Sequence, residues 1–205
     1  MKMFAPIILL STLPFSVLAE ENVTAEKYKG FYAGVELMST DYAYKDDTVS
    51  SDLSRETGYA LNVGYLYPVN DNFYLAGELS YADFGTSNVQ ASEFFKDNSL
   101  SGSIEFYTTA FIFNLKPTYY FGHSDFSLAG VIGFGSYNTF LNLRNEPRFI
   151  FAEETESAFS YGLEANYGLT ENVSLTASYM TTSIEYVGNT DVDLDAISFG
   201  LNYHF

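Results

Sequence analysis

The sequence predicts an all-β fold, a transmembrane antiparallel up-and-down β-barrel of eight strands with short periplasmic turns and long extracellular loops. Three observations support this fold class. Apolar and polar residues alternate along much of the chain, which is the pattern of strands with one apolar and one polar face. Short turns alternate with long polar connections, as they do in barrels that cross a membrane. Aromatic residues recur at two levels of the apolar face, where such barrels place their interfacial girdles.

The first 30 residues precede the expected barrel. Lys2 is followed by a mostly apolar run over residues 5–18 and by Ala19, which is the pattern of a secretory signal peptide with its cleavage site. The sequence therefore predicts a cleaved signal peptide over residues 1–19, a short periplasmic N-terminal segment over residues 20–30 and an outer-membrane barrel domain over residues 31–205. No later segment is continuously apolar over the length of a membrane-spanning helix, so no such helix is expected.

Eight stretches carry the strand pattern. In the last of them, "AISFGLNYHF", every second residue is apolar, and the residues between are alanine, glycine or polar. The predicted strands cover residues 31–37, 59–67, 73–81, 104–119, 126–137, 161–169, 173–179 and 195–205. The fourth and fifth strands are apolar on both faces in places, so alternation does not assign their inward and outward positions.

The connections between these strands are of two kinds. Three connections are short and have the composition of tight turns: residues 68–72, 120–125 and 170–172. The other connections, over residues 39–57, 83–103, 138–157 and 184–195, are long, polar and acidic. With an even number of strands, both termini are expected at the end that carries the short turns.

The placement of the aromatic residues separates a membrane barrel from a soluble one. A soluble, lipocalin-like barrel would turn its apolar face inward around a ligand. Along a tilted strand, eight residues climb about 21 Å, which is close to the height of a membrane barrel's apolar band. The aromatic residues form a lower level (Phe31, Tyr67, Phe73, Tyr119, Phe126, Tyr167 and Tyr203) and an upper level (Tyr59, Tyr81, Tyr107, Phe159 and Tyr179). The apolar face is therefore expected to point outward into lipid.

Three segments carry a family resemblance: "FYAGVEL", "YLYPVNDNFYLAGELSYADFG" and "SFGLNYHF". They resemble the OmpA/OmpX-type eight-stranded outer-membrane β-barrel family, and the resemblance covers nearly the whole chain after the leader. It implies a location in the cell outer membrane, with outer-membrane lipid and lipopolysaccharide as partners. It also implies recognition by the barrel-assembly machinery, which reads the final strand in this family, and it assigns that signal to Tyr203 and Phe205.

The net charge of the chain limits the classes of partner that it can bind. A formal net charge of −17 argues against nucleic acid. The acidic loops are expected to stay solvated, or to share divalent ions with lipopolysaccharide phosphates. Asp191, Asp193 and Asp195 alternate along "TDVDLDA" and are the candidate metal ligands, but the glycine and the distal glutamate of an EF-hand are missing. A solvated strand tip is the favoured interpretation, so neither a metal nor a cofactor is predicted.

Histidine placement argues against an enzyme. Some barrels of the resembling family are lipid-modifying enzymes, and some larger barrels are surface proteases; the resemblance implies that they use a histidine at the outer rim as general base. The two histidines of this chain, His123 and His204, both fall at the short-turn end. Histidine is the commonest general base near neutral pH, so the sequence predicts that the protein is not an enzyme.

Residues 138–157 differ from the other long connections. They combine apolar residues with two arginines, a composition typical of protein-binding surfaces. The candidate partner-binding residues are Phe140, Arg144, Arg148, Phe149 and Phe151, and a host or matrix protein is the candidate partner. The alternative interpretation is that this segment extends two strands as a hairpin above the membrane.

The inward positions predict a polar cluster in the lumen. Glu36, Glu78 and Glu164 have inward parity at similar heights. Asn62, Asn114 and the single nearby cation, Lys116, are expected at about the same level. The favoured interpretation is a polar plug between the strands; the alternative is a constriction gated by the pairing of glutamate and lysine.

The sequence thus predicts a monomeric integral outer-membrane protein with a structural or surface-interaction role, in adhesion or envelope integrity, carried by its acidic loops. The alternatives are a narrow, weakly cation-selective, porin-like channel and, third, a lipid-modifying enzyme. Eight strands leave an interior that side chains just fill, so a channel should conduct poorly.

Overall fold

Eight strands account for nearly all of the residues that the computed structural model describes, which are 28–46, 49–90, 103–122, 124–145, 148–186 and 190–205. The strands are β1 (Gly30–Asp46), β2 (Val49–Pro68), β3 (Phe73–Gln90), β4 (Ser103–Tyr120), β5 (Phe126–Asn145), β6 (Arg148–Gly168), β7 (Val173–Tyr186) and β8 (Thr190–His204). None of the described residues belongs to a helix long and apolar enough to cross a membrane.

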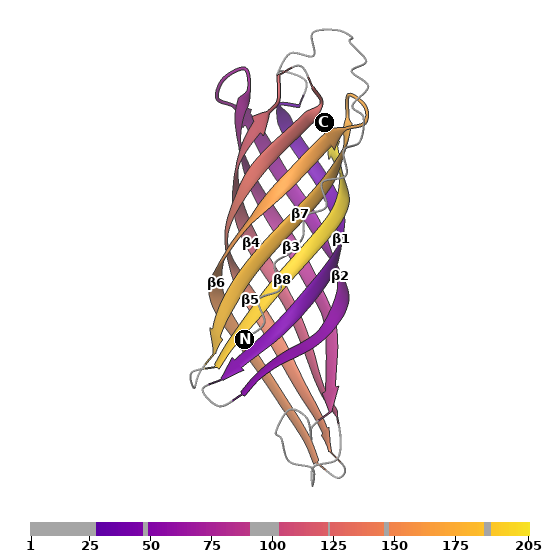
Figure 1. Ribbon diagram of the computed structural model, residues 1–205, viewed down its shortest axis with the longest axis vertical. Helices are drawn as coiled ribbons and strands as arrows, with labels where there is room; N and C mark the ends of the chain where they lie inside the picture. The colour runs from indigo at the N-terminus through magenta and orange to yellow at the C-terminus, as the bar shows by residue number, and fades with distance from the viewer. Residues whose placement is uncertain (1–27, 47–48, 91–102, 123, 146–147, 187–189) are drawn as a thin grey trace.

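The strands close into a barrel in chain order. Each strand pairs antiparallel with the next, and β8 closes the barrel on β1, from Tyr32↔His204 to Lys45↔Asp191. In Figure 1 the strands tilt around a common axis, with the end of β8 at the top and the β5–β6 hairpin reaching furthest at the bottom. The turns β2–β3, β4–β5 and β6–β7 lie at the "turn end" with the C-terminus; the opposite end is called the "hairpin end". The predicted fold class, a closed antiparallel barrel of eight strands, is confirmed.

The outside of the barrel is an apolar belt. Its outward side chains are large and exposed, as in Phe31 at 67 %, Phe111 at 70 % and Leu163 at 69 %. Soluble monomers rarely expose continuous apolar surface on this scale, whereas the lipid-facing side of a membrane barrel requires it. The apolar face points outward, as the aromatic pattern predicts.

A second apolar cluster fills the lumen toward the hairpin end. Ile112 on β4, Tyr137 on β5 and Phe84 on β3 point inward and are at most 1 % exposed. They pack together with Met38, Tyr42, Ala60, Ala82, Ala110, Ala158, Ile184, Leu194 and Ala196. This lumen apolar cluster explains why the fourth and fifth strands are apolar on both faces: one face meets lipid and the other meets the packed interior.

The strands run further toward the hairpin end than the sequence analysis expects. Most of the predicted loops over residues 39–57, 138–157 and 184–195 is strand, and β3 and β4 shorten the predicted loop over residues 83–103. That prediction was wrong because it ended each strand where its apolar face ended. Beyond the belt the outward face meets water and becomes polar, while backbone pairing continues and inward residues such as Tyr42 and Leu194 still pack in the lumen. Cross-strand polar pairs support it, such as Arg55 with Asp41 at 2.8 Å.

Candidate functional site

A polar cluster lies in the lumen between the apolar cluster and the turn end. At its centre, Nζ of Lys116 on β4 lies 2.6 Å from Oε2 of Glu78 on β3 and 2.7 Å from Oε2 of Glu164 on β6. All three side chains are buried. Lys116 therefore bridges carboxylates that approach it from two different strands.

Neutral donors complete the environment of Glu78. The side-chain amide of Asn114 donates to Oε1 of Glu78 at 3.1 Å, and the Tyr32 hydroxyl donates to Oε2 at 2.8 Å. Since buried carboxylates need hydrogen-bond donors on both oxygens, these contacts fix the orientation of Glu78 in the lumen.

Glu36 lies beside this bridge with a different set of partners. Nδ2 of Asn62 donates to its Oε1 at 2.6 Å, and the hydroxyls of Ser198 and Ser178 donate to its Oε2. The structure thus buries all the side chains singled out for the lumen, Glu36, Asn62, Glu78, Asn114, Lys116 and Glu164. Glu36 and Asn62 form one hydrogen-bonded group, and Glu78, Asn114, Lys116 and Glu164 form another. Among the lysines and arginines whose side chains the structure describes, Lys116 is the only one that is buried.

The cluster separates two small cavities. The one toward the hairpin end, of about 50 Å³, is lined by Glu36, Asn62 and Glu78 among others and is called the upper cavity. The one toward the turn end, of about 30 Å³, is called the lower cavity, because the turn end is the predicted periplasmic side, although Figure 1 draws that end at the top. Lys116 and Glu164 line both cavities, so this pair forms the partition between them. Spaces of this size hold a few water molecules.

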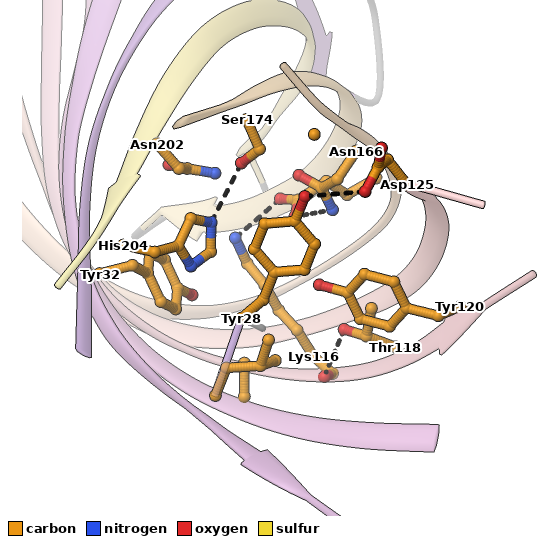
Figure 2. A pocket seen from close by; sticks show the side chains of 14 residues that line it. Tyr28, Tyr32, Lys116, Thr118, Tyr120, Asp125, Asn166, Ser174, Asn202 and His204 are labelled. Atoms are coloured by element: carbon orange, nitrogen blue, oxygen red, sulfur yellow. Dashed lines mark hydrogen bonds and ion pairs between the residues drawn. The ribbon is translucent and has the colours of Figure 1, made fainter. Parts of the chain in front are cut away.

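The lower cavity is closed at the turn end by Tyr28, which precedes β1. Figure 2 shows its ring between those of Tyr120 and His204, with centroid separations of 5.8 and 5.1 Å. The Tyr28 hydroxyl donates to Oδ1 of Asp125 at 3.1 Å. Sequence reasoning missed this residue, because a single aromatic residue ahead of the first strand carries no periodic signal.

At the hairpin end the barrel divides into two walls. The β2–β3 pairing ends at Tyr59↔Asp83, and the β6–β7 pairing ends at Ser160↔Thr182. Beyond these pairs, the described pairings join β7, β8, β1 and β2 in one wall and β3, β4, β5 and β6 in the other. Residues 148–159 of β6, called the "β6 edge", therefore pair with β5 and, among the described residues, have no ladder pairing on the opposite side. At the start of this edge, the Thr182 hydroxyl of β7 donates to the carbonyl of Phe159 at 2.7 Å.

The candidate partner-binding residues lie in the β5–β6 hairpin. Phe140 stands opposite Glu153, and its ring lies 6.0 Å from that of Tyr107. Arg144, Arg148, Phe149 and Phe151 belong to the same two strands, but their side chains fall outside the described part of the structure. Their backbone forms the hairpin of the alternative interpretation.

Of the three candidate metal ligands on β8, the structure describes the side chains of Asp193 and Asp195. Oδ1 of Asp195 accepts a hydrogen bond from the Tyr179 hydroxyl at 2.9 Å, and the side chain of Asp191 is not described. No group of three or more histidine, cysteine, aspartate or glutamate residues suited to a metal ion occurs among the described residues.

The C-terminal residues lie at the turn end on the outer surface. Phe205 is 76 % exposed and packs edge-on against Tyr203, with ring centroids 5.2 Å apart. The Phe205 amide donates to the carbonyl of Phe31 at 3.0 Å. The two aromatic rings are therefore displayed toward lipid beside the seam that closes the barrel.

Comparisons with known proteins support the same fold. The structure is similar to that of Ail, the attachment invasion locus protein of Yersinia pestis, in complex with the heparin analogue sucrose octasulfate, with a TM-score of 0.51 and 14% identity over 85% of this chain and 99% of that one. It is also similar to the outer membrane protease OmpT from Escherichia coli, with a TM-score of 0.50 and 10% identity over 91% and 99% of the two chains. A comparison with curated proteins finds no match.

The family model for the outer membrane protein beta-barrel domain matches residues 5–205. This match agrees with the closed barrel, its apolar belt and its polar lumen. The chain therefore belongs to the outer membrane protein beta-barrel family and is a protein of the outer membrane.

Proposed function

We propose that this protein is a surface-interaction protein, in which the barrel is the anchor and the β6 edge binds an extended segment of a host or matrix protein. The observation that carries the proposal is the unequal pairing of β6. Its pairing with β5 runs to Asn145↔Arg148, whereas its pairing with β7 stops at Ser160↔Thr182. A closed barrel normally leaves no edge, so a long one-sided segment at the hairpin end calls for an explanation.

An open strand edge is a template for adding a strand. Its backbone N–H and C=O groups are positioned to pair with an extended peptide, and the flanking side chains then select the sequence of that peptide. Figure 1 supports this use of β6, because the β5–β6 hairpin extends beyond the other strands. The edge is thereby held clear of the belt.

The charge of the β6 edge favours a basic partner. Glu153 and Glu154 are exposed and Glu156 is half-buried, so carboxylates occupy both faces of the edge. A second copy of this chain would bring like charges together, which opposes pairing between two edges. Lysine or arginine at alternate positions of an added strand would complement the carboxylates. Ail is described with a sulfated heparin analogue, but the net charge of −17 makes a polyanion a poor ligand for this chain.

The closed lumen supports an anchoring role over conduction. The apolar cluster, the Lys116 partition and Tyr28 occupy successive levels of the described barrel. An ion crossing it would have to displace packed apolar side chains as well as a buried ion pair. The proposal therefore favours a non-conducting barrel over the weakly cation-selective channel.

The position of the described histidine supports a role without catalysis. Nε2 of His204 lies 3.1 Å from Oγ of Ser174 in the lower cavity, behind Tyr28. His123 lies outside the described residues. Although OmpT is a protease, shared fold does not imply shared chemistry, and His204 lies at the end opposite the β6 edge.

The proposal is tested with a peptide in which lysine alternates with threonine, added to the protein in lipid nanodiscs. Fluorescence anisotropy of the labelled peptide should show binding. Reversing two edge charges, Glu154→Lys with Glu156→Lys, should weaken the affinity by about tenfold or more, since close charge pairs at interfaces couple by more than about 1.5 kcal/mol.

Two controls separate strand addition from simple charge attraction. The double change Asp71→Lys with Glu171→Lys alters the net charge equally in the turns at the opposite end and should leave the affinity unchanged. A peptide methylated on alternate backbone nitrogens keeps its charge but loses its donors, and it should not bind. Equal binding of the methylated peptide, or no binding of either peptide, would show that the β6 edge does not act in this way.

A separate prediction concerns the role of Phe205 as an assembly signal. Because its ring is displayed beside the β1–β8 seam and makes little contact within the barrel, Phe205→Ala should reduce the amount of protein in the outer membrane while leaving the refolded barrel as stable as before. The measurements are immunoblots of outer-membrane fractions and heat-dependent gel mobility of protein refolded in detergent. Phe121→Ala, also an exposed phenylalanine at the turn end (44 %), is the control and should assemble normally. Unchanged membrane levels of Phe205→Ala would refute the signal role.

A further inference from the structure

We infer that Tyr28 is a plug that seals the lower cavity and controls access to Lys116 from the turn end. Tyr28 is only 6 % exposed although it lies outside the strand pairings. Its side chain contacts parts of the barrel that are remote in sequence, including β4, β8 and the β4–β5 turn. Figure 2 shows the ring lying across the opening of the cavity, in front of Lys116.

Two glycines allow this placement. Gly30, at φ 125°, has a backbone conformation that other residues rarely adopt; it lies between Tyr28 and the body of β1. At Gly168 on β6, an added Cβ would lie 1.9 Å from the Tyr28 hydroxyl oxygen. The barrel wall therefore has a space that the tyrosine hydroxyl occupies, and any residue larger than glycine at position 168 would fill it.

The side chain, not the backbone, provides the seal. The aromatic contacts with Tyr120 and His204 hold the ring flat across the cavity, while the hydroxyl reaches Asp125 at 3.1 Å and the carbonyl of Thr170 at 3.5 Å. Since strands β1 and β8 pair independently of this residue, removing the ring should open the cavity without opening the barrel. The polar groups behind it, Lys116, Glu164, Asn166 and Ser174, would then meet water from the turn end.

The experiment uses a cysteine reporter in the cavity. The chain contains no cysteine, so a single introduced cysteine can report on the cavity. The reporter is Thr118→Cys, because Thr118 lines the lower cavity and is 4 % exposed. The rate of labelling by a small charged methanethiosulfonate is measured on the full-length barrel in nanodiscs. Adding Tyr28→Ala should raise this rate by about tenfold or more, because buried groups react only through openings of the structure.

Two further variants test the mechanism. Gly168→Ala keeps the tyrosine but fills the space for its hydroxyl, and it should raise the rate as well. Tyr28→Phe keeps the ring and its stacking, and it should change the rate less than threefold. Tyr67→Ala removes an exposed tyrosine at the turn end that faces outward, at 61 % exposure, and should leave the rate unchanged.

The possible outcomes decide the inference. Heat-dependent gel mobility is measured for every variant to establish that the barrel has closed. If the Tyr28→Ala and Gly168→Ala barrels close but their reporter cysteine is labelled no faster than in the parent, the inference that Tyr28 is a plug is wrong. So would failure of both variants to close, because Tyr28 would then be required for the barrel itself and would not act as a seal within it.

Discussion

Replacing Lys116 with methionine should lower the free energy of unfolding of the barrel by about 3–5 kcal/mol, the cost typical of removing one partner from a buried ion pair. Glu78 and Glu164 would lose the ammonium group that lies 2.6 and 2.7 Å away and would remain buried. Methionine approximates the length of the lysine side chain, so the loss reports charge more than cavity formation. The measurement is urea unfolding of the refolded barrel in lipid vesicles, followed by circular dichroism.

A triple variant provides the matched control for this prediction. Lys116→Met combined with Glu78→Gln and Glu164→Gln removes all three charges of the bridge at nearly constant volume. Most of the lost stability should return, because neutral groups of similar shape often replace a buried ion pair without loss. A loss below about 1 kcal/mol for Lys116→Met alone would place the pair in the range of exposed salt bridges and contradict the bridging role.

The second large effect concerns the outer surface. Leu163→Arg should destabilise the barrel by about 2–4 kcal/mol, as measured for arginine at the bilayer midplane of membrane barrels. Leu163 is 69 % exposed on the belt, and along β6 it lies midway between the aromatic residues Phe159 and Tyr167. The charge would therefore be placed where neither interface is close enough for the side chain to reach water. Urea unfolding in vesicles measures the loss.

The control for Leu163→Arg is the same substituent on the same strand and face. Thr155 is exposed on β6 beyond the belt, where both faces of the hairpin meet water. Thr155→Arg should change the stability by less than about 1 kcal/mol, the range near the interfaces. Equal losses at the two positions would mean that Leu163 does not face lipid.

The composition of the lumen cluster could be predicted from sequence because strand parity is a local property. Glu36, Glu78 and Glu164 each follow an alternation that their own strand displays, and inward parity follows directly. Counting from the turns also places them at similar heights. Which carboxylates contact Lys116 depends on the stagger between strands, and the registers Glu78↔Asn114 and Ala129↔Glu164 come only from the structure.

Other features had no periodic signal or a misleading one. The lumen apolar cluster obscured the parity of the fourth and fifth strands, because an inward Ile112 or Tyr137 looks the same in sequence as an outward residue. The strand ends toward the hairpin end looked like loops because their outward face is polar beyond the belt, and the few inward apolar residues, such as Tyr42 and Leu194, do not make a regular alternation. The role of Tyr28 depends on a bend at Gly30 and a space at Gly168, which no pattern within either segment reveals.

Alternation along the chain was enough to predict a barrel of eight strands with an apolar face toward lipid and a polar cluster in the lumen, because it assigns the two faces of each strand separately. The point at which neighbouring strands stop pairing at the hairpin end is known from the structure alone. The β6–β7 pairing stops at Ser160↔Thr182 while β6 continues to Arg148 alongside β5. An open edge depends on two strands at once: β7 continues to Tyr186 paired with β8, but it no longer pairs with β6 beyond Thr182. No residue on β6 alone could indicate that separation.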